Sequence, residues 1–424
     1  MVNFFKLATF LIFIACYTLI VLYYEKKAKI VWTGIGILLL LMVISPIESL
    51  DAINWNVLGI YVGMLFISEI LIYSKVPDYL AGMLVSKVKN ASMVLLMIAF
   101  LSGLISVAIE NVAVVLIVAP LALAVSRRLK ISPVPVLIAV AISANLQGVA
   151  TLIGDPPSML LAGFAKMTFL DFFIFDGKPS LFFAVQIGAI ASLVVLYFFF
   201  RKHTEKMHDI ETIQPISMFP AALIAVLVIA LIMTSFYDPN FGYMAGIVTV
   251  TLGIVAIAWY YFHKKEDVVP MIKRVDWETG FFLIGVFIMV AALIKVGLIE
   301  DMARIIASFT GHNLLLTFTS IVGGSVAMSA FVDNVPFVAT MLPVVHRIAE
   351  LTGVNPTLYY FGMLLGASVG GNITPMGASA NIVAMGIAKK EGFKTDFWEF
   401  VKMGLPFTIA ATLASTAFIY IIFG

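Results

Sequence analysis

Residues 143–158 of this chain read SANLQGVATLIGDPPS, and residues 366–381, 223 positions later, read GASVGGNITPMGASAN. Both stretches interrupt long apolar runs with glycine, proline, threonine and asparagine. Glycine permits unusual backbone angles, and proline removes a backbone donor and breaks a helix. Inside a bilayer, such a break survives only where protein buries it or a wet cavity lines it. The two stretches therefore predict two discontinuous helices at membrane depth.

The composition indicates a membrane protein. Of the 424 residues, 62% are hydrophobic and 12% are charged, whereas soluble domains are about half apolar and about a quarter charged. The net charge is only +2, and the basic residues lie in loops. Nucleic-acid binding therefore has no support. The single cysteine, Cys16, excludes a disulfide within the chain and any multi-cysteine metal site.

The apolar runs predict ten crossing helices and two re-entrant hairpins. Each hairpin is predicted where a longer apolar stretch carries a polar break in its middle, namely 92–126 with Glu110-Asn111 and 314–346 with Asp333-Asn334. The crossing helices are expected at 4–23, 30–48, 56–74, 134–164, 180–200, 217–236, 241–262, 278–298, 357–388 and 400–423.

The basic residues orient these helices. One face collects 20 of the 26 Lys and Arg residues when the hairpins return to their own sides. The positive-inside rule makes that face cytoplasmic, in the cell (inner) membrane, and it leaves both termini on the outer face. The residues counted on this face are those of the linkers 24–29, 75–91, 127–133, 201–216, 263–275 and 389–399, together with Lys402 at the start of the next helix.

An internal repeat relates the two halves of the chain. Residues 102–166 align on 325–389 without a gap, and Glu110 falls on Asp333. Each half, 1–212 and 213–424, holds five crossings and one hairpin. Because five is odd, the second half enters the membrane from the opposite side. The predicted fold is an all-α polytopic membrane protein of two inverted repeats, an architecture typical of secondary transporters. The identical pairs include Asn111/Asn334, Gly148/Gly371, Thr151/Thr374, Gly154/Gly377 and Lys166/Lys389.

The polar residues of the breaks are the candidate site for a transported solute or ion. Carbonyl ends of broken helices can hold a cation, and helix N-termini can hold an anion or a polar solute. The candidate residues are Glu110, Asn111, Asn145, Thr151, Gly154, Asp155, Asp333, Asn334, Thr374, Gly377, Ser379 and Asn381.

Three of these candidates are acids. A carboxylate at the bilayer centre costs roughly 2.5–3.5 kcal/mol, and the sequence places no Lys or Arg within the breaks. Glu110, Asp155 and Asp333 therefore indicate reversible binding of a proton or Na⁺. The alternative is that each acid caps a half-helix, most strongly Asp155, which precedes Pro156. Glu69, within the third span, is open to both interpretations.

At these motifs the sequence resembles the ion transporter superfamily. It is most similar to the branch of arsenite permeases, NhaD-type sodium–proton antiporters and the pink-eyed-dilution protein, which share a citrate-transporter-like domain. The motifs that carry the resemblance are Glu110-Asn111-Val112 with Pro120, ATLIGDPP at 150–157, VDNVPF at 332–337 and GASAN at 377–381.

The resemblance implies re-entrant hairpins, a scaffold and a transport domain, a homodimer and elevator-type alternating access. By motif, it also implies a site formed by Asn111, Thr151, Gly154, Asn334, Thr374, Gly377 and Asn381. Related dicarboxylate carriers have Ser-Asn-Thr at each hairpin tip. This chain has Glu110 and Asp333 in place of the serines, which disfavours a dianionic substrate.

Several functions stay open from the sequence. The leading one is ion-coupled export of an inorganic ion or an arsenite-type solute, driven by H⁺ or Na⁺. A sodium–proton antiporter and a carboxylate or organic-anion transporter are the alternatives, and a channel fits two opposed hairpins less well. The spans hold no nucleophile–base set and no phosphate-cradling loop, so no enzymatic activity, cofactor or resident metal is expected. An external ATPase is left open as a partner.

Overall fold

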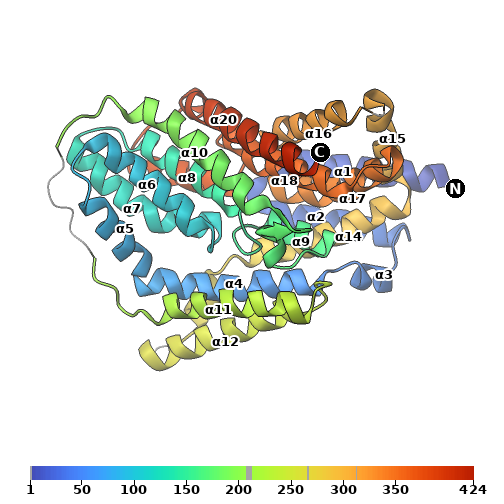
Figure 1. Cartoon of the computed structure of the whole chain (residues 1–424). Helices are drawn as coiled ribbons and strands as arrows, with labels where there is room; N and C mark the ends of the chain where they lie inside the picture. Colours follow the sequence, from blue (N-terminus) through green and yellow to red (C-terminus); the bar gives the residue numbers. More distant parts are fainter. Residues whose placement is uncertain (1, 207–212, 265–266, 312) are drawn as a thin grey trace.

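The computed structural model describes residues 2–206, 213–264, 267–311 and 313–424, and it is almost entirely helical. The helices pack side by side along one long direction of the molecule (Figure 1). The boundary expected between residues 212 and 213 adjoins residues 207–212, which lie outside the described part.

The first half contains ten α-helices, two short 3₁₀ helices and a small β-hairpin. In chain order these are α1 (Val2–Leu22), η1 (Tyr24–Lys26), α2 (Lys27–Leu40), α3 (Pro46–Asp51), α4 (Trp55–Ser74), α5 (Val76–Ser86), α6 (Ala91–Ser106), α7 (Asn111–Leu129), α8 (Val134–Gly148), α9 (Pro156–Ala165), η2 (Leu170–Phe172), β1 (Ile174–Phe175), β2 (Lys178–Pro179) and α10 (Leu181–Phe200).

The second half repeats this helix order. Its helices are α11 (Phe219–Tyr237), α12 (Met244–Lys264), α13 (Val269–Arg274), α14 (Trp277–Lys295), α15 (Leu298–Thr310), α16 (Leu314–Ser329), α17 (Asn334–Thr352), α18 (Pro356–Gly370), η3 (Gly371–Ile373), α19 (Ser379–Lys390) and α20 (Phe397–Phe423). Eight of the helices in the described residues are long and apolar enough to span a membrane: α1, α4, α7, α10, α11, α12, α14 and α20.

One expected span is wrong, and two connecting segments contain helices that the sequence did not predict. The span expected at 30–48 ends early, because α2 stops at Leu40 and Ser45 starts the new helix α3 with a capping box to Glu48. The segment 75–91 was expected to be a linker but contains α5, and α15 occupies part of the segment expected to join the span 278–298 to the second hairpin. A proline in the first turn of α5 favours that helix start.

The first hairpin, α6 and α7, begins and ends at one end of the molecule. Its start is fixed by backbone hydrogen bonds from Ala91 and Ser92 to residues that follow α10. Its end is fixed by an ion pair between Arg127 and Glu391, which follows α19. Since α10 packs against α20, and Lys178 before α10 reaches Ile422 near the end of α20, residues 201–206 and 391–396 share one end. The hairpin thus returns to its own side.

The second hairpin, α16 and α17, lies toward the opposite end, where α15 and the N-terminus are also found (Figure 1). Its last turn is joined to α15 by an ion pair between Arg347 and Glu300, and α15 is joined to α1 by Asp301 and Lys6, 2.5 Å apart. Hydrogen bonds from Arg347 and Arg304 hold the pKa of Glu300 at about 2. The two hairpins therefore approach the middle of the molecule from opposite ends.

Helices α4 and α12 approach each other closely because glycines line their contact. A Cβ atom on Gly63 would lie 2.3 Å from the carbonyl oxygen of Thr249, and one on Gly59 would lie 2.9 Å from the Cα of Gly246. Small residues are the usual means by which membrane helices bring their backbones together. The position of α4 matters for the site, because α4 also contacts α7 and α9.

We expect Gly63→Val to lower the stability of the folded protein. The added side chain must push α12 away, and overpacking of this kind costs roughly 1–3 kcal/mol. The measurement is the thermal unfolding midpoint of purified protein in detergent, followed by tryptophan fluorescence. Gly36→Ala is the matched control, because a Cβ atom there meets nothing within 4 Å. Equal midpoints for the two variants would contradict the close contact.

Candidate functional site

Both predicted helix breaks are present. Residues 149–155 separate α8 from α9, and residues 371–378, including η3, separate α18 from α19. The residue before each second half-helix, Asp155 or Ala378, has the same extended backbone, with φ of −150° in both. These positions are equivalent in the repeat, so the two breaks share one backbone geometry as well as one sequence pattern.

Each break is bound to the hairpin of its own half. The hydroxyl of Thr151 donates to the carbonyl of Val107 at the tip of the first hairpin, and Thr374 donates to Ala330 at the tip of the second. The two threonines and the two carbonyls are equivalent pairs in the repeat. The threonines predicted as site residues thus hold the hairpin tips against the breaks.

The two candidate glycines lie where no side chain fits. A Cβ atom on Gly154 would lie 2.3 Å from the carbonyl oxygen of Gly148, and one on Gly377 would lie 2.5 Å from that of Gly371. Both would also meet a hairpin carbonyl at 2.8 Å, Ser106 in the first half and Ser329 in the second. Gly154 and Gly377 therefore allow each break to fold back on its own first half-helix and on the hairpin.

Three buried asparagines join the two halves at the breaks. The amide of Asn145 on α8 donates to the side-chain oxygens of Asn372 at 2.9 Å and Asn381 at 3.0 Å. The amide of Asn372 returns to α8 by donating to the carbonyl of Ile142. The sequence predicted Asn145 and Asn381 but missed Asn372. The repeat gives no signal for Asn372, because its equivalent residue is Val149.

Asn381 also closes the second break. Its amide donates to the carbonyls of Gly371 and Thr374, both at 2.9 Å. These carbonyls belong to the interrupted turn and lack a partner within a continuous helix. The equivalent residue in the first half is Ser158, whose buried hydroxyl has no hydrogen-bond partner in the described part of the chain. The two halves therefore share a backbone geometry but differ in how their breaks are satisfied.

The remaining neutral candidates lie at the starts of helices. Asn111 is the first residue of α7 and accepts a hydrogen bond of 2.7 Å from Ser106, within the first hairpin. Asn334, its equivalent, is buried at the start of α17. Ser379 is the first residue of α19, and its hydroxyl is hydrogen-bonded to that of Tyr24.

Each of the three acids caps a helix. Glu110 accepts from the backbone of Val112 and Ala113, Asp155 from Ser158, and Asp333 from Val335. A carboxylate in this position also interacts favourably with the positive end of the helix. The capping interpretation is thus correct for one oxygen of each acid. The second oxygens of Asp155 and Asp333 are buried and have no hydrogen-bond partner among the described residues.

A buried lysine that the sequence assigned to a loop lies near these acids. Lys27 is only 5% exposed, and its ammonium donates to the hydroxyl of Tyr24 at 3.0 Å and lies 4.7 Å from the centre of that ring. The charge of Lys27 acts on both Asp333 and Glu110. No Lys or Arg lies within the breaks in the sequence, but the fold places Lys27 near them. Only the tertiary structure, in which Tyr24 of η1 is hydrogen-bonded to Ser379 at the start of α19, brings Lys27 there.

A second tyrosine, Tyr17, contacts the second hairpin. The hydroxyl of Tyr17 on α1 donates to the carbonyl of Pro336 at 2.5 Å and contacts the hydroxyl of Thr340 at 2.8 Å. Together with Tyr24, it joins the N-terminal helices of the chain to α17 and α19. No pattern in the sequence distinguished these two tyrosines from those at the membrane surface.

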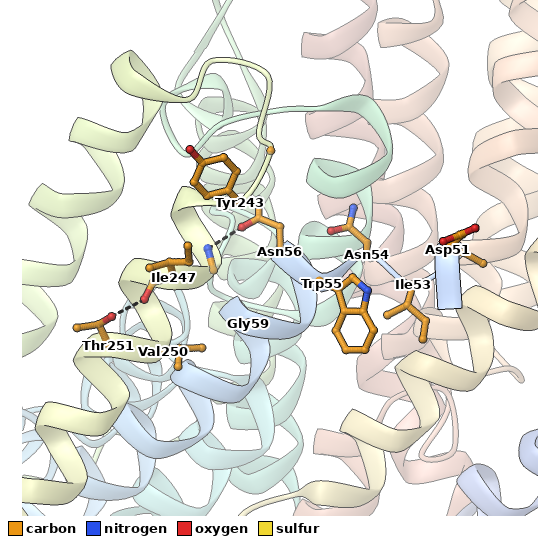
Figure 2. A pocket seen from close by; sticks show the side chains of 13 residues that line it. Asp51, Ile53, Asn54, Trp55, Asn56, Gly59, Tyr243, Ile247, Val250 and Thr251 are labelled. Atoms are coloured by element: carbon orange, nitrogen blue, oxygen red, sulfur yellow. Dashed lines mark hydrogen bonds between the residues drawn. The ribbon is translucent and has the colours of Figure 1, made fainter. Parts of the chain in front are cut away.

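A cavity of about 660 Å³ lies away from the breaks, between the starts of α4 and α12 (Figure 2). Its lining includes Asn54, Trp55 and Tyr243, and the side chain of Asn56 accepts a hydrogen bond of 2.6 Å from the backbone of Gly246. None of the predicted site residues lines this cavity. Asn54 caps α4, as its repeat equivalent Asp276 caps α14.

Comparison with known sequences identifies similar proteins over nearly the whole chain. The sequence model of the citrate transporter family matches residues 17–366 and 321–424. An uncharacterized transporter of Mycobacterium tuberculosis is 30% identical over 426 residues, which cover 97% of this chain and 98% of that protein. The human P protein is 24% identical over 459 residues, covering 89% of this chain and 54% of the P protein.

Two solved structures share the fold. The YdaH transporter of Alcanivorax borkumensis superposes with a TM-score of 0.59, at 16% identity, over 86% of this chain and 84% of that one. MtrF of Neisseria gonorrhoeae superposes with a TM-score of 0.54, at 17% identity, over 86% and 80% of the two chains. At these identities, the likeness concerns the fold alone.

We expect Asn145→Ala to destabilise the protein, because it leaves the side-chain oxygens of Asn372 and Asn381 buried without this donor. An unsatisfied buried group costs roughly 1–3 kcal/mol. The readout is the thermal unfolding midpoint in detergent. Ser415→Ala is the control, because the partners of that buried hydroxyl among the described residues are carbonyls of its own helix, α20. A midpoint for Asn145→Ala as high as that of the control would show that the asparagine network contributes no stability.

Proposed function

The chain belongs to the citrate transporter family and is an integral multi-pass membrane protein; from this premise we propose that it is an ion-coupled secondary active transporter. The solute is an inorganic ion or an arsenite-type neutral oxyacid, exported in exchange for H⁺ or Na⁺. The carrier consists of two inverted repeats, 1–212 and 213–424, with its site where their broken helices meet.

The observation that carries this proposal is the convergence of both breaks on one buried polar network. Asn145 of the first repeat bonds to Asn372 and Asn381 of the second, and the acids beside the breaks retain an unpaired oxygen at Asp155 and Asp333. Unpaired acceptors in a low-dielectric interior are costly unless a ligand satisfies them. A proton or Na⁺ provides what these oxygens lack.

Unequal exposure of equivalent residues supports alternating access. Ile153 in the first break is 1% exposed, whereas its repeat equivalent Met376 in the second break is 61% exposed. In an inverted repeat, a conformational change can exchange the environments of the two halves. We propose that this exchange, by an elevator-type movement of the hairpins and broken helices, moves the site between the two membrane faces.

The same proposal includes the setting of the carrier. It lies in the cell (inner) membrane with both termini on the outer face, as a homodimer, and needs no resident metal or other cofactor. The basic linkers at the end of the molecule that holds Arg127 support this orientation, since that end is the predicted cytoplasmic face.

The test is transport by purified protein in liposomes with an imposed pH gradient. Na⁺, Li⁺, arsenite and citrate are supplied in turn, and a pH dye and radiolabelled solute report movement. Dequenching by Na⁺ alone selects a sodium–proton antiporter. Arsenite movement selects the arsenite-type carrier. No movement of any of these ions or solutes under the pH gradient would overturn the proposal.

We expect Asp333→Asn to abolish ion-coupled transport while leaving the protein folded. Asparagine caps a helix about as well as aspartate, so the substitution removes the charge and keeps the cap on α17. Asp396→Asn is the matched control, because Asp396 caps α20 in the same way at an exposed position. Liposome transport and the thermal unfolding midpoint are measured together. Coupled transport at the wild-type rate in Asp333→Asn would exclude this acid from coupling.

A second candidate function, carboxylate transport, is favoured by Lys27. Its buried ammonium has one hydrogen-bond acceptor, Tyr24, in the described part of the chain, and Tyr24 is in turn bonded to Ser379 at the second break. A cation so placed offers unused donors to an anion. Because Glu110 and Asp333 would repel a dianion, a monoanion fits this arrangement better.

Lys27→Met distinguishes the two candidates. If a carboxylate is the substrate, its KM in the liposome assay should rise roughly 10- to 100-fold, since a charged hydrogen bond contributes about 1.5–3 kcal/mol. If arsenite or Na⁺ is the substrate, its KM should not rise. Lys26→Met is the control, since Lys26 is exposed in the same turn.

A further inference from the structure

A small cavity lies beside the tip of the first hairpin, separate from the asparagine network. Its volume is about 120 Å³, and it lies between α4, the start of α7, α9 and the segment before α14. A water occupies roughly 30 Å³ in the liquid, so the cavity has room for an ion with a few waters. Its polar lining consists of Tyr61, Ser68, Glu69, Glu110, Arg274 and Asp276.

The residues that line this cavity differ in exposure. Arg274 and Asp276 are exposed, Glu69 and Glu110 are half-buried, and Ser68 is 6% exposed. The linker that carries Arg274 belongs to the predicted cytoplasmic face. The cavity therefore joins a linker of that predicted face to the acid at the tip of the first hairpin.

Three oxygen groups inside the cavity are not satisfied by the protein. The buried hydroxyl of Ser68 has no hydrogen-bond partner within the described residues. Glu110 caps α7 through Oε2, so its Oε1 is left without a hydrogen bond from the described residues. Glu69 forms no ion pair or hydrogen bond in the described part of the chain, and Arg274 acts on it through its charge alone.

Asp276, the third acid of the lining, already has hydrogen-bond donors. Both carboxylate oxygens of Asp276 accept hydrogen bonds from Thr279, at 3.0 and 2.6 Å. The hydroxyl of Tyr61 donates to the backbone carbonyl of Asp276. The unsatisfied groups are thus all acceptor oxygens or a hydroxyl, and two of them belong to acids. Hard monovalent cations prefer ligands of this kind.

We propose that this cavity is a cation-binding site, which takes Na⁺ or a proton from the cytoplasmic side between Glu69, Ser68 and Oε1 of Glu110. The inference rests on the proposed function in that the bound cation is the coupling ion. It adds Glu69 and Ser68, which lie on α4, to the acids of the breaks. Besides Glu69, the titratable or charged side chains that line the cavity are Tyr61 of α4, Glu110 at the hairpin tip, Arg274 of α13 and Asp276.

Binding is tested on purified protein in detergent, without transport, so that failure of the site and failure of the transport proposal are separate results. The thermal unfolding midpoint is measured against NaCl concentration at pH 8 and pH 6, with choline chloride keeping ionic strength constant. We expect Na⁺ to raise the wild-type midpoint at pH 8 and to do so less at pH 6, because protons compete for the same carboxylates. If the cavity takes only protons, the midpoint responds to pH and not to Na⁺.

Two variants and one control assign the response to the cavity. Glu69→Gln should lose at least 10-fold in apparent affinity for the cation. Ser68→Ala, which keeps every charge and is small enough to preserve packing, should weaken the Na⁺ response and leave the pH response unchanged. Glu205→Gln, at an exposed loop position, should behave as the wild type.

The proposal is overturned if Glu69→Gln and Ser68→Ala keep the wild-type Na⁺ and pH responses. It is also overturned if the wild-type midpoint responds to neither ion. In that second case, the liposome assay still decides whether the chain is a transporter, because it measures solute movement and not cation binding in this cavity.

Discussion

Backbone polar groups freed by a helix break have to be satisfied inside the bilayer, and the rest of this structure depends on that constraint. Water is scarce at membrane depth, so the partners come from the protein. Asn381 donates to two carbonyls of the second break, and Thr151 and Thr374 bond each break to a hairpin carbonyl. Each hairpin tip is therefore held against the break of its own half.

The same constraint explains why the two halves of the chain meet where they do. A single asparagine on α8, Asn145, supplies donors to Asn372 and Asn381 across the boundary between the halves. Glycines at 154 and 377 let the chain fold back tightly enough for these contacts. The groups that stabilise the fold at its centre are thus among those that we propose for the solute site.

The charged groups near the breaks are only partly paired. Each acid gives one oxygen to the N-terminus of a helix, where the helix dipole favours it, and Asp155 and Asp333 keep a second oxygen without a partner. Lys27 contributes a positive charge that acts on the acids of both hairpins without forming an ion pair with Asp333. A site in which opposite charges lie near each other but unpaired can respond to an added ion more readily than a closed salt bridge can.

The sequence alone determined the all-helical membrane fold, both hairpins, both breaks and the capping role open to the acids. These features follow from local rules, since apolar length, glycine, proline and a polar residue before a helix act within a few positions of the chain. Tertiary structure alone decided that Lys27 and Tyr24 lie beside Ser379, that Asn372 completes the asparagine network, and that Glu69 shares a cavity with Glu110. These pairs are distant in sequence, and only the packing of helices from different segments brings them within reach of one another.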